Sequence, residues 1–223
     1  MRWSRSVVAV GERVWTRRDT RRVAAAAATL AGGAVVARAG VPGLERTVFE
    51  AINGLPDALY GPIWIPMQSG SLVGGLILAA ALGVTTRRPV VAAVAVGAVT
   101  SAWLVAKEVK DLVQRERPLG AGLDAEVRDD SIGWGYASGH SAVAFAMYAV
   151  AAPHLRPPWR RAALGLAFFV AWARIYSGAH LPLDVVGGAA LGVILGEAFR
   201  VAEAWHAGRR SGRTVTSDSS GSA

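Results

Sequence analysis

Three short clusters of polar residues stand out in a chain that is otherwise rich in apolar residues. They occupy residues 110–118, 136–140 and 174–184. Lys110, Arg117 and Arg174 supply three cations to these clusters, enough to hold the oxygens of a phosphate dianion. The planar guanidinium group of arginine suits bidentate contact with such oxygens. Lys110 and Arg117 are seven residues apart, or about two helical turns, so both can point to one side if the helix continues that far. These residue types therefore predict a phosphate-binding site.

The second cluster adds a different kind of anion site. Ser138 and Gly139 lie where a helix is expected to begin, and free backbone N–H groups and the positive end of the helix dipole attract anions there. Glycine also lets a phosphate approach the backbone closely. Both residues are therefore predicted to bind phosphate.

Two histidines and an aspartate complete the predicted chemistry. His180 precedes Asp184 by four residues, and Pro182 between them can start a helix. The carboxylate can accept a hydrogen bond from Nδ1, fix the tautomer and stabilise the imidazolium, which leaves Nε2 free to attack phosphorus. His140 can then protonate the leaving alkoxide. The alternative interpretation is a structural pair of His180 and Asp184. No metal is needed, because the cations neutralise the phosphate charge.

The order and spacing of these residues resemble the type 2 phosphatidic acid phosphatase (PAP2) superfamily. The matching patterns are Lys-x6-Arg-Pro, Ser-Gly-His and Arg-x5-His-x3-Asp, within residues 110–184. The family includes lipid phosphate phosphatases and is similar in its core to vanadium haloperoxidases and bacterial acid phosphatases. The resemblance implies an all-helical bundle, with six spans in membrane members. It also implies a phosphohistidine intermediate on His180, with His140 as the acid and later the base.

The chain departs from the family pattern at two positions. Ala137 stands where the second motif usually opens with proline, and Ala173 stands where the third usually has serine. Neither position is catalytic in the family.

The elements that must position these residues read as membrane helices. The chain of 223 residues is 52% hydrophobic and 18% charged, with a mean hydropathy of +0.34, and a soluble domain of this length needs a more polar surface. Apolar stretches approach the roughly 20 residues that cross a bilayer. They occupy residues 23–39, 68–84, 89–106, 141–152 (extendable to 138–154), 162–175 and 183–199. The predicted fold is all-α, a polytopic membrane bundle of six transmembrane helices.

Charge distribution sets the predicted topology. With a cytoplasmic N-terminus, the cytoplasmic segments hold 16 of the 24 Lys and Arg residues, in agreement with the positive-inside rule. We expect a basic cytoplasmic arm over residues 1–22, a six-span phosphatase domain over 23–205 and a disordered cytoplasmic tail over 206–223. An amphipathic stretch over residues 44–55 is expected to lie along the outer interface. The three polar clusters then meet at the extracytoplasmic face of the cell membrane.

Other features exclude rival classes of protein. The formal net charge of +8 comes from short clusters at the ends of apolar runs, which argues against nucleic-acid binding. There is no cysteine, so disulfides and thiolate metal sites are excluded. The acidic residues Asp124, Glu126, Asp129 and Asp130 are interpreted as a flexible outer loop, not a metal site. Tyr136 and Trp134 fit either a lipid entrance or interfacial anchors.

We therefore predict a membrane enzyme that needs no cofactor and hydrolyses a phosphomonoester or diphosphate of a lipid. A polyprenyl diphosphate, phosphatidate or phosphatidylglycerol phosphate would fit, with a polyprenyl carrier preferred by analogy. The expected partners are this substrate and the surrounding membrane lipids; the sequence leaves the oligomeric state open. Two alternatives are a phosphotransferase that uses the same intermediate and a non-catalytic lipid-binding or transport protein. An intact His180–Asp184 pair argues against the last, because binding alone requires no nucleophile.

Overall fold

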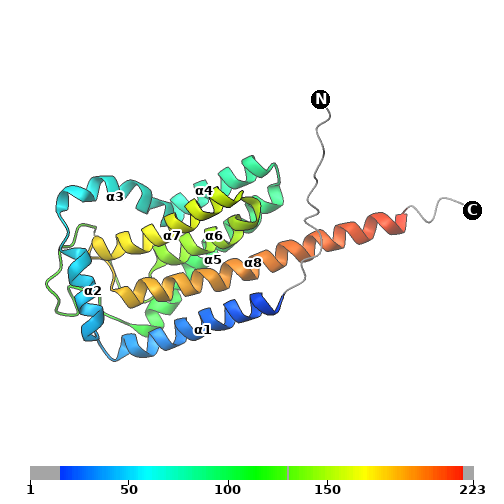
Figure 1. Ribbon diagram of the computed structural model, residues 1–223. Helices are drawn as coiled ribbons and strands as arrows, with labels where there is room; N and C mark the ends of the chain where they lie inside the picture. The colour runs from blue at the N-terminus through cyan, green and yellow to red at the C-terminus, as the bar shows by residue number, and fades with distance from the viewer. Residues whose placement is uncertain (1–15, 130, 218–223) are drawn as a thin grey trace, which may run out of the picture.

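The computed structural model describes residues 16–129 and 131–217, with side chains described as far as residue 205, and every regular element in this part is a helix. Figure 1 shows the long helices running roughly side by side, with α2 across one end. The elements are α1 (Arg17–Arg38), α2 (Gly43–Asn53), η1 (Asp57–Leu59), α3 (Tyr60–Met67), η2 (Gln68–Gly70), α4 (Leu72–Thr86), α5 (Pro89–Val113), α6 (Gly139–Ala151), η3 (Ala152–His154), α7 (Pro157–Tyr176) and α8 (Pro182–Ser217).

Helix α6 is the centre of the bundle. It packs against α4, α5, α7 and α8, and nearly all of its side chains are buried, most of them alanine, valine, phenylalanine or methionine. A helix that is apolar on all sides is stable only when other helices surround it. His140 lies in the first turn of α6, so it stands at one end of this apolar core, next to the polar segment that connects α5 and α6.

Small residues bring α6 and α8 very close together. A Cβ atom built on Gly188 would lie 3.0 Å from the Ser141 Cβ, one on Gly192 would lie 2.9 Å from the Ala146 backbone nitrogen, and one on Gly196 would lie 2.9 Å from the Ala146 carbonyl oxygen. Real Cβ atoms need more space, so each of these positions requires glycine. The repeat of four residues places all three on one face of α8.

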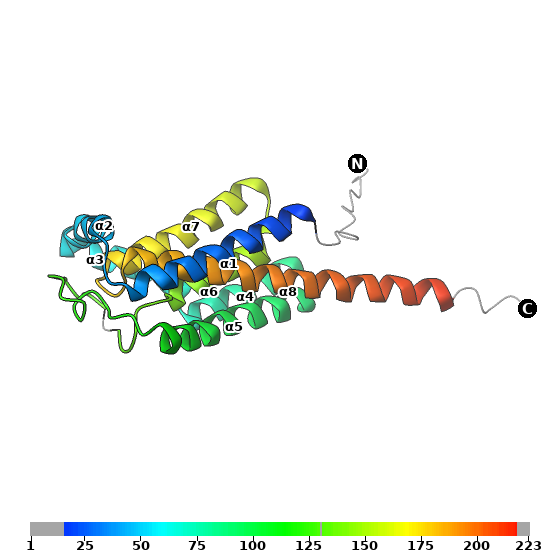
Figure 2. The same cartoon turned by 90° about the horizontal axis from the view of Figure 1, so that it is seen from below.

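Two sharp bends shape the end of the bundle that carries α2. Helix α2 turns by 94° from α1, and the segment Asp57–Gly70 makes an angle of 64° with α4. Figure 2 shows α2 and α3 at the same end, beside the point where α8 begins. The predicted amphipathic stretch is thus a helix, with Phe49 buried and Leu44 exposed.

Among the described residues, two helices are long and apolar enough on their own to cross a membrane, namely α5 and the Pro182–Trp205 part of α8. Each bent pair, Arg17–Arg38 with Gly43–Asn53 and Asp57–Gly70 with Leu72–Thr86, passes the same test when its two helices are taken together. Helix α6 has only 13 residues, and α7 carries Arg160, Arg161 and Arg174 within its 20 residues, so neither qualifies alone. Large apolar side chains such as Val35, Val73, Ile77 and Phe168 are exposed on the bundle. These features support a membrane protein, and the count of six spans stays a prediction.

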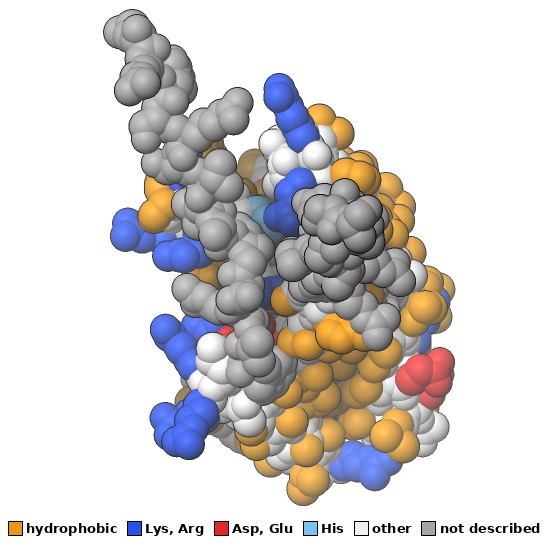
Figure 3. Space-filling view, turned by 90° about the vertical axis from the view of Figure 1, so that its right-hand side faces the viewer, with side chains coloured by type: hydrophobic (Ala, Val, Ile, Leu, Met, Phe, Trp, Pro, Cys, Tyr) orange, Lys and Arg blue, Asp and Glu red, His pale blue; other side chains and the backbone are white. Residues whose placement is uncertain are grey.

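The basic clusters gather at the end of the bundle opposite α2. Figure 3 views the molecule from that side, with Lys and Arg side chains spread around the rim. The exposed arginines there come from the start of α1, the α4–α5 turn and the start of α7, for example Arg18, Arg87 and Arg160.

Helices extend past both predicted ends of the phosphatase domain. Helix α1 begins at Arg17 and not at residue 23, because Thr16 and Asp19 form a capping box there. Helix α8 is described as far as Ser217, past residue 206, where the disordered tail was predicted to begin, and the domain bounds stay predictions. Residues 1–15 of the predicted arm and 218–223 of the tail lie outside the described residues.

Candidate active site

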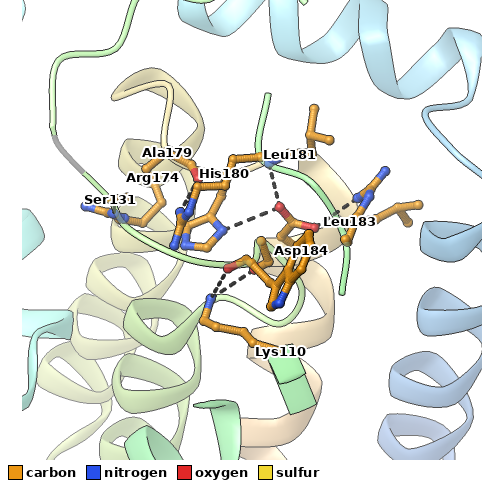
Figure 4. A network of polar contacts seen from close by, with 12 residues as sticks. Lys110, Ser131, Arg174, Ala179, His180, Leu181, Leu183 and Asp184 are labelled. Carbon is orange, nitrogen blue, oxygen red and sulfur yellow. Dashed lines mark hydrogen bonds and ion pairs between the residues drawn. The ribbon is translucent and has the colours of Figure 1, made fainter. Parts of the chain in front are cut away.

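Four helix ends meet beneath α2 and bring the three polar clusters together. Lys110 lies in the last turn of α5 and Arg174 in the last turn of α7, while His140 and Asp184 lie in the first turns of α6 and α8. Because α5 and α7 run toward this end and α6 and α8 start from it, residues far apart in sequence become neighbours. Figure 4 shows Lys110, Arg174, His180 and Asp184 around one centre.

His180 and Asp184 form a buried pair. His180 is in the turn between α7 and α8, and its Nδ1 lies 3.4 Å from Asp184 Oδ2, at the long end for a hydrogen bond. The same carboxylate oxygen accepts a hydrogen bond from the Leu181 backbone nitrogen at 2.9 Å. His180 is 2% exposed and Asp184 is fully buried. This arrangement favours the tautomer with a proton on Nδ1 and a free lone pair on Nε2.

The surroundings of His180 keep its imidazole neutral. Burial lowers the pKa of His180 well below its usual value, and the positive charges of nearby Lys110, Arg117 and Arg174 lower the pKa further. A neutral imidazole is the form that can attack phosphorus. The group is therefore ready to act as a nucleophile at neutral pH.

Arg174 is the most deeply buried of the three cations, at 3% exposure. One of its terminal nitrogens pairs with the Asp129 carboxylate, and the other donates to the Ser131 hydroxyl at 2.7 Å. Its Nε has no hydrogen-bond partner among the described residues. The guanidinium group thus keeps donor capacity beyond what the protein uses.

Arg117 and Lys110 donate to backbone oxygens of the segment 132–135, and Arg117 also donates to Ala179. Arg117 donates to the carbonyl oxygens of Gly133 at 2.7 Å, Ile132 at 3.1 Å and Ala179 at 2.5 Å. Lys110 Nζ donates to the carbonyls of Trp134 at 3.2 Å and Gly135 at 3.0 Å.

Burial and the charge of Arg174 lower the pKa of Arg117 to about 10, so it stays protonated at neutral pH. Carbonyl oxygens are neutral and leave the charges of Arg117 and Lys110 without compensation. The three cations together therefore favour an anion.

The start of α6 matches an anion site. Ser138 is fully buried, and its hydroxyl has neither a capping role nor any other hydrogen bond within the described part of the chain. A Cβ built on Gly139 would meet only Ala106, at 3.9 Å, so packing does not explain the glycine. The first N–H groups of a helix have no acceptor within it. Ser138 thus offers a hydroxyl without a partner in the described residues, and Gly139 leaves room beside the backbone.

The structure corrects the predicted route of Arg117 to the site. Helix α5 ends at Val113, and Gln114 adopts a left-handed conformation with φ 54°. Arg117 therefore does not share a helix face with Lys110, as their separation of two turns suggested. It reaches the same centre from the loop, since its donors and those of Lys110 meet neighbouring carbonyls between residues 132 and 135.

The acidic loop is held in place, contrary to the flexible loop predicted for it. Arg128 donates to the carbonyls of Asn53, Leu55 and Tyr176 at 2.7–2.9 Å and pairs with Asp57. Asp129 belongs to the site through Arg174. Asp130 lies outside the described residues, whose side chains form no group of three or more His, Asp or Glu residues placed to hold a metal ion.

Three further residues singled out in the sequence, Tyr136, Ala137 and Ala173, lie in apolar clusters. Tyr136 is fully buried, and its hydroxyl donates to the Leu30 carbonyl at 2.5 Å, so it is a core residue and neither an interfacial anchor nor part of an entrance. Ala137 and Ala173, the two departures from the family pattern, are fully buried in separate apolar clusters. Alanine has an apolar side chain, so both residues fit these apolar surroundings.

Two residues in contact with the site were missed from the sequence. Arg115 donates to Asp184 Oδ1 at 2.9 Å and to Glu45, which comes from α2. Arg115 sits in the first cluster, between Lys110 and Arg117, and its position there was the available signal. Glu45 had a weaker signal, as an acidic residue in an amphipathic stretch.

Comparison with known proteins places this geometry in a family. Residues 88–206 match the PAP2 superfamily. The chain is 30% identical over 161 residues to the Escherichia coli (strain K12) protein named "Putative undecaprenyl-diphosphatase YbjG", an alignment that covers 68% of this chain and 78% of that protein.

Two solved structures share the fold. LpxE from Aquifex aeolicus superposes with a TM-score of 0.59 at 23% identity and covers 69% of this chain and 92% of its own. A transmembrane PAP2-type phosphatidylglycerolphosphate phosphatase from Bacillus subtilis superposes with a TM-score of 0.61 at 20% identity, covering 78% and 94%.

Proposed function

Because the chain belongs to the PAP2 superfamily of membrane phosphatases, we propose that it removes phosphate from a lipid through a covalent intermediate on His180. One observation carries the proposal. Two histidines, an aspartate and three cations from four helix ends and two loops converge at one buried centre. Mere binding of an anion would need the cations but not the His180–Asp184 pair.

The proposed reaction has two steps. His180 Nε2 attacks phosphorus while the bond to the leaving oxygen breaks, and the proton for that oxygen comes from His140. Asp184 stabilises the imidazolium character that His180 gains, through the Nδ1 contact of 3.4 Å. His140 then takes a proton from water, which attacks the phosphohistidine and releases phosphate and neutral His180.

Lys110, Arg117, Arg174 and the amides at the start of α6 are proposed to neutralise the phosphoryl oxygens. Each cation carries donors that now meet oxygens of residues 129–135. Positively charged donors placed where charge develops lower the barrier most when water is excluded. On this mechanism no divalent metal is required.

Among lipid phosphates, we favour a polyprenyl diphosphate. The curated relative from Escherichia coli carries a name for that activity, and the alignment extends over most of both chains. Phosphatidate and phosphatidylglycerol phosphate also present a phosphate on a lipid anchor.

The active site is proposed to lie at the extracytoplasmic face of a six-span protein with both described chain ends cytoplasmic. The support is the rim of exposed arginines at the end opposite the site. A reporter fused after Arg88 should read cytoplasmic, and one in the loop over residues 121–132 should read extracytoplasmic. The reverse pattern would exclude a substrate in the outer leaflet.

Phosphate release tests the function directly. Detergent-purified protein is incubated with polyprenyl diphosphate, phosphatidate or phosphatidylglycerol phosphate, with and without EDTA, and a His180→Ala preparation is the control. We expect release that survives EDTA and is inhibited by vanadate, which adopts the trigonal-bipyramidal geometry of the transition state. Absence of release from every lipid would refute the phosphatase. Strict dependence on Mg²⁺ would refute the metal-free mechanism, and label recovered on an alcohol acceptor would indicate phosphotransfer.

A further inference from the structure

A buried chain of charges links α2 to the His180–Asp184 pair. Glu45, on α2, is 6% exposed, and both of its carboxylate oxygens accept from Arg115, at 3.0 and 2.6 Å. Arg115 is 4% exposed and also donates to Asp184 Oδ1 at 2.9 Å. The other oxygen of Asp184 faces His180. Two residues, Arg115 and Asp184, therefore link the carboxylate of Glu45 to the proposed nucleophile.

Glu45 also holds the beginning of α8. The Leu183 backbone nitrogen donates to Glu45 Oε1 at 2.7 Å, and Leu183 immediately precedes Asp184. A carboxylate at a helix N-terminus is favoured by the helix dipole. Glu45 thus touches both the side chain that pairs with Asp184 and the backbone that carries it.

The linked charges are those of two carboxylates, Glu45 and Asp184, and of the guanidinium group of Arg115 between them. Burial alone would lower the pKa of Arg115, but the hydrogen bonds that it donates to Glu45 and the charges of Asp184 and Glu45 outweigh it and raise the pKa. Arg115 is therefore a permanent cation that is shared between two carboxylates. Without the charge of Glu45, Asp184 alone would compensate it and would have less negative potential left for the imidazolium of His180.

Stability does not account for such an arrangement. Replacing a buried ion pair by apolar side chains of similar volume is often neutral or stabilising, because desolvating the charges offsets their attraction. The apolar residues around α2, such as Phe49 and Leu181, would accommodate that alternative. The charges of Glu45 and Arg115 instead act on Asp184, which Arg115 contacts directly.

We propose that Glu45 is a positioning residue for the reaction: by holding Arg115 and the first turn of α8, it fixes the orientation of Asp184 and, through Asp184, that of His180. This inference rests on the proposed function of the same site. Glu45 itself touches neither the substrate nor the reacting atoms.

The test compares wild-type protein with Glu45→Gln, Glu45→Asp and the control Glu50→Gln, which alters an exposed glutamate on the same helix. Turnover of p-nitrophenyl phosphate is measured in detergent, so the result does not depend on the lipid that the enzyme prefers. Glu45→Gln is expected to lower kcat by roughly tenfold to a hundredfold, the range for residues that orient a reacting group, with KM unchanged. Glu45→Asp restores the charge and should recover part of kcat, and Glu50→Gln should match wild type.

A double-mutant cycle separates positioning from a general structural role. If Glu45 acts through Asp184, Glu45→Gln should change kcat by less than about twofold in an Asp184→Asn background, because the group it positions has lost its charge. A full additional loss in that background would overturn the proposal, as would a raised KM at unchanged kcat. If Glu45→Gln does not purify as folded protein, Glu45→Asp decides: a wild-type kcat would overturn the proposal, and a lowered kcat at constant KM supports it.

The two proposals fail in different ways. Wild-type protein that releases no phosphate from any lipid contradicts the proposed function, whatever Glu45 does to p-nitrophenyl phosphate turnover. Wild-type protein that is active, with Glu45→Gln equally active, contradicts the role of Glu45 alone.

Discussion

The two ends of the bundle each carry a cluster of charges with a histidine, and the clusters are built differently. At the end opposite α2, Glu197 lies 2.5 Å from Arg200 and 3.9 Å from Arg22, and Glu203 lies 3.7 Å from Arg88 and 3.5 Å from His154. Each carboxylate there has an arginine of its own. At the α2 end, Lys110, Arg117 and Arg174 face one another around His180, and Asp129 is the carboxylate that pairs with one of them.

This difference separates a structural cluster from a reactive one. In the first cluster each arginine faces a carboxylate, and such pairs hold α8 against its neighbours, whereas Lys110 and Arg117 at the other end meet neutral backbone carbonyls. Three cations close together repel one another, and this repulsion persists in the fold only where something else is gained. Unbalanced charge at a buried site is therefore the more informative sign of chemistry.

Replacing the histidine at each end by alanine should give the largest difference in activity between the two ends. His180→Ala should lower phosphate release by at least about a thousandfold, because no other side chain at the centre can form the intermediate in its place. His154→Ala, at the opposite end, should stay within about twofold of wild type. Phosphate release by both variants, purified in detergent, makes the comparison, and a fully active His180→Ala would remove the distinction between the ends.

The acid His140 should show a substrate-dependent effect. His140→Ala is expected to lower release from a lipid phosphate by roughly a hundredfold or more, the usual contribution of general acid catalysis. A leaving group such as p-nitrophenolate needs little protonation, so the loss should be smaller with p-nitrophenyl phosphate, whereas His180→Ala should lose both activities. Equal losses of His140→Ala on the two substrates would mean that His140 is not the acid.

Removing the carboxylate that pairs with Arg174 should increase the excess of positive charge at the site. Asp129→Asn should lower the inhibition constant of vanadate by about threefold to fivefold, since a partly exposed ion pair contributes up to about 1 kcal/mol and here competes with the anion. Glu203→Gln, in the cluster at the end opposite α2, should leave that constant unchanged. Inhibition titrations of the two variants measure the difference. Weaker inhibition of Asp129→Asn would show that Asp129 supports anion binding instead.

The smallest expected effect is on the way the stability of the folded protein depends on pH. The pKa of His180 is lower in the folded protein than in the unfolded chain, so the unfolded chain binds the extra proton and unfolding is favoured as the pH falls below about 6.5. The loss is at most about 1.4 kcal/mol per pH unit, or about 3 °C in melting temperature for a chain of this size. His180→Gln should flatten the dependence between pH 6.5 and 5. An unchanged slope would place the stability loss in other groups.

Much of the site was predictable because its residues lie close to helix ends. Lys110, Ser138, His140, Arg174 and Asp184 each fall within a turn of a boundary that glycine, proline or the apolar pattern marks. The family resemblance then indicated which ends belong together, and the helical fold followed from the same apolar pattern.

The contributions of α2 and of the 129–135 segment were not predictable. Glu45 and Arg115 are 70 residues apart, and no local pattern indicates that they pair. Arg117 reaches the centre through a left-handed residue, Gln114, at the end of α5, whereas the spacing suggested a continuous helix. Loop paths of this kind depend on tertiary contacts, which periodicity does not encode.

The face of α8 that carries Gly188, Gly192 and Gly196 has a consequence for how this protein can vary. These glycines lock the axial register of α8 against α6, because α6 backbone atoms fill the space where their side chains would be. Asp184 stands near the start of α8, upstream of its locked stretch, and His140 lies in the first turn of α6, next to Ser141, which Gly188 contacts.

A slip of one helical turn would displace one helix by about 5.4 Å relative to the other and separate the acid from the nucleophile's partner. Insertions beyond Gly196 would lengthen α8 away from the centre and leave that spacing intact. A change in length between Asp184 and Gly196 would therefore disrupt the site of this protein, whereas a change in length beyond Gly196 would not.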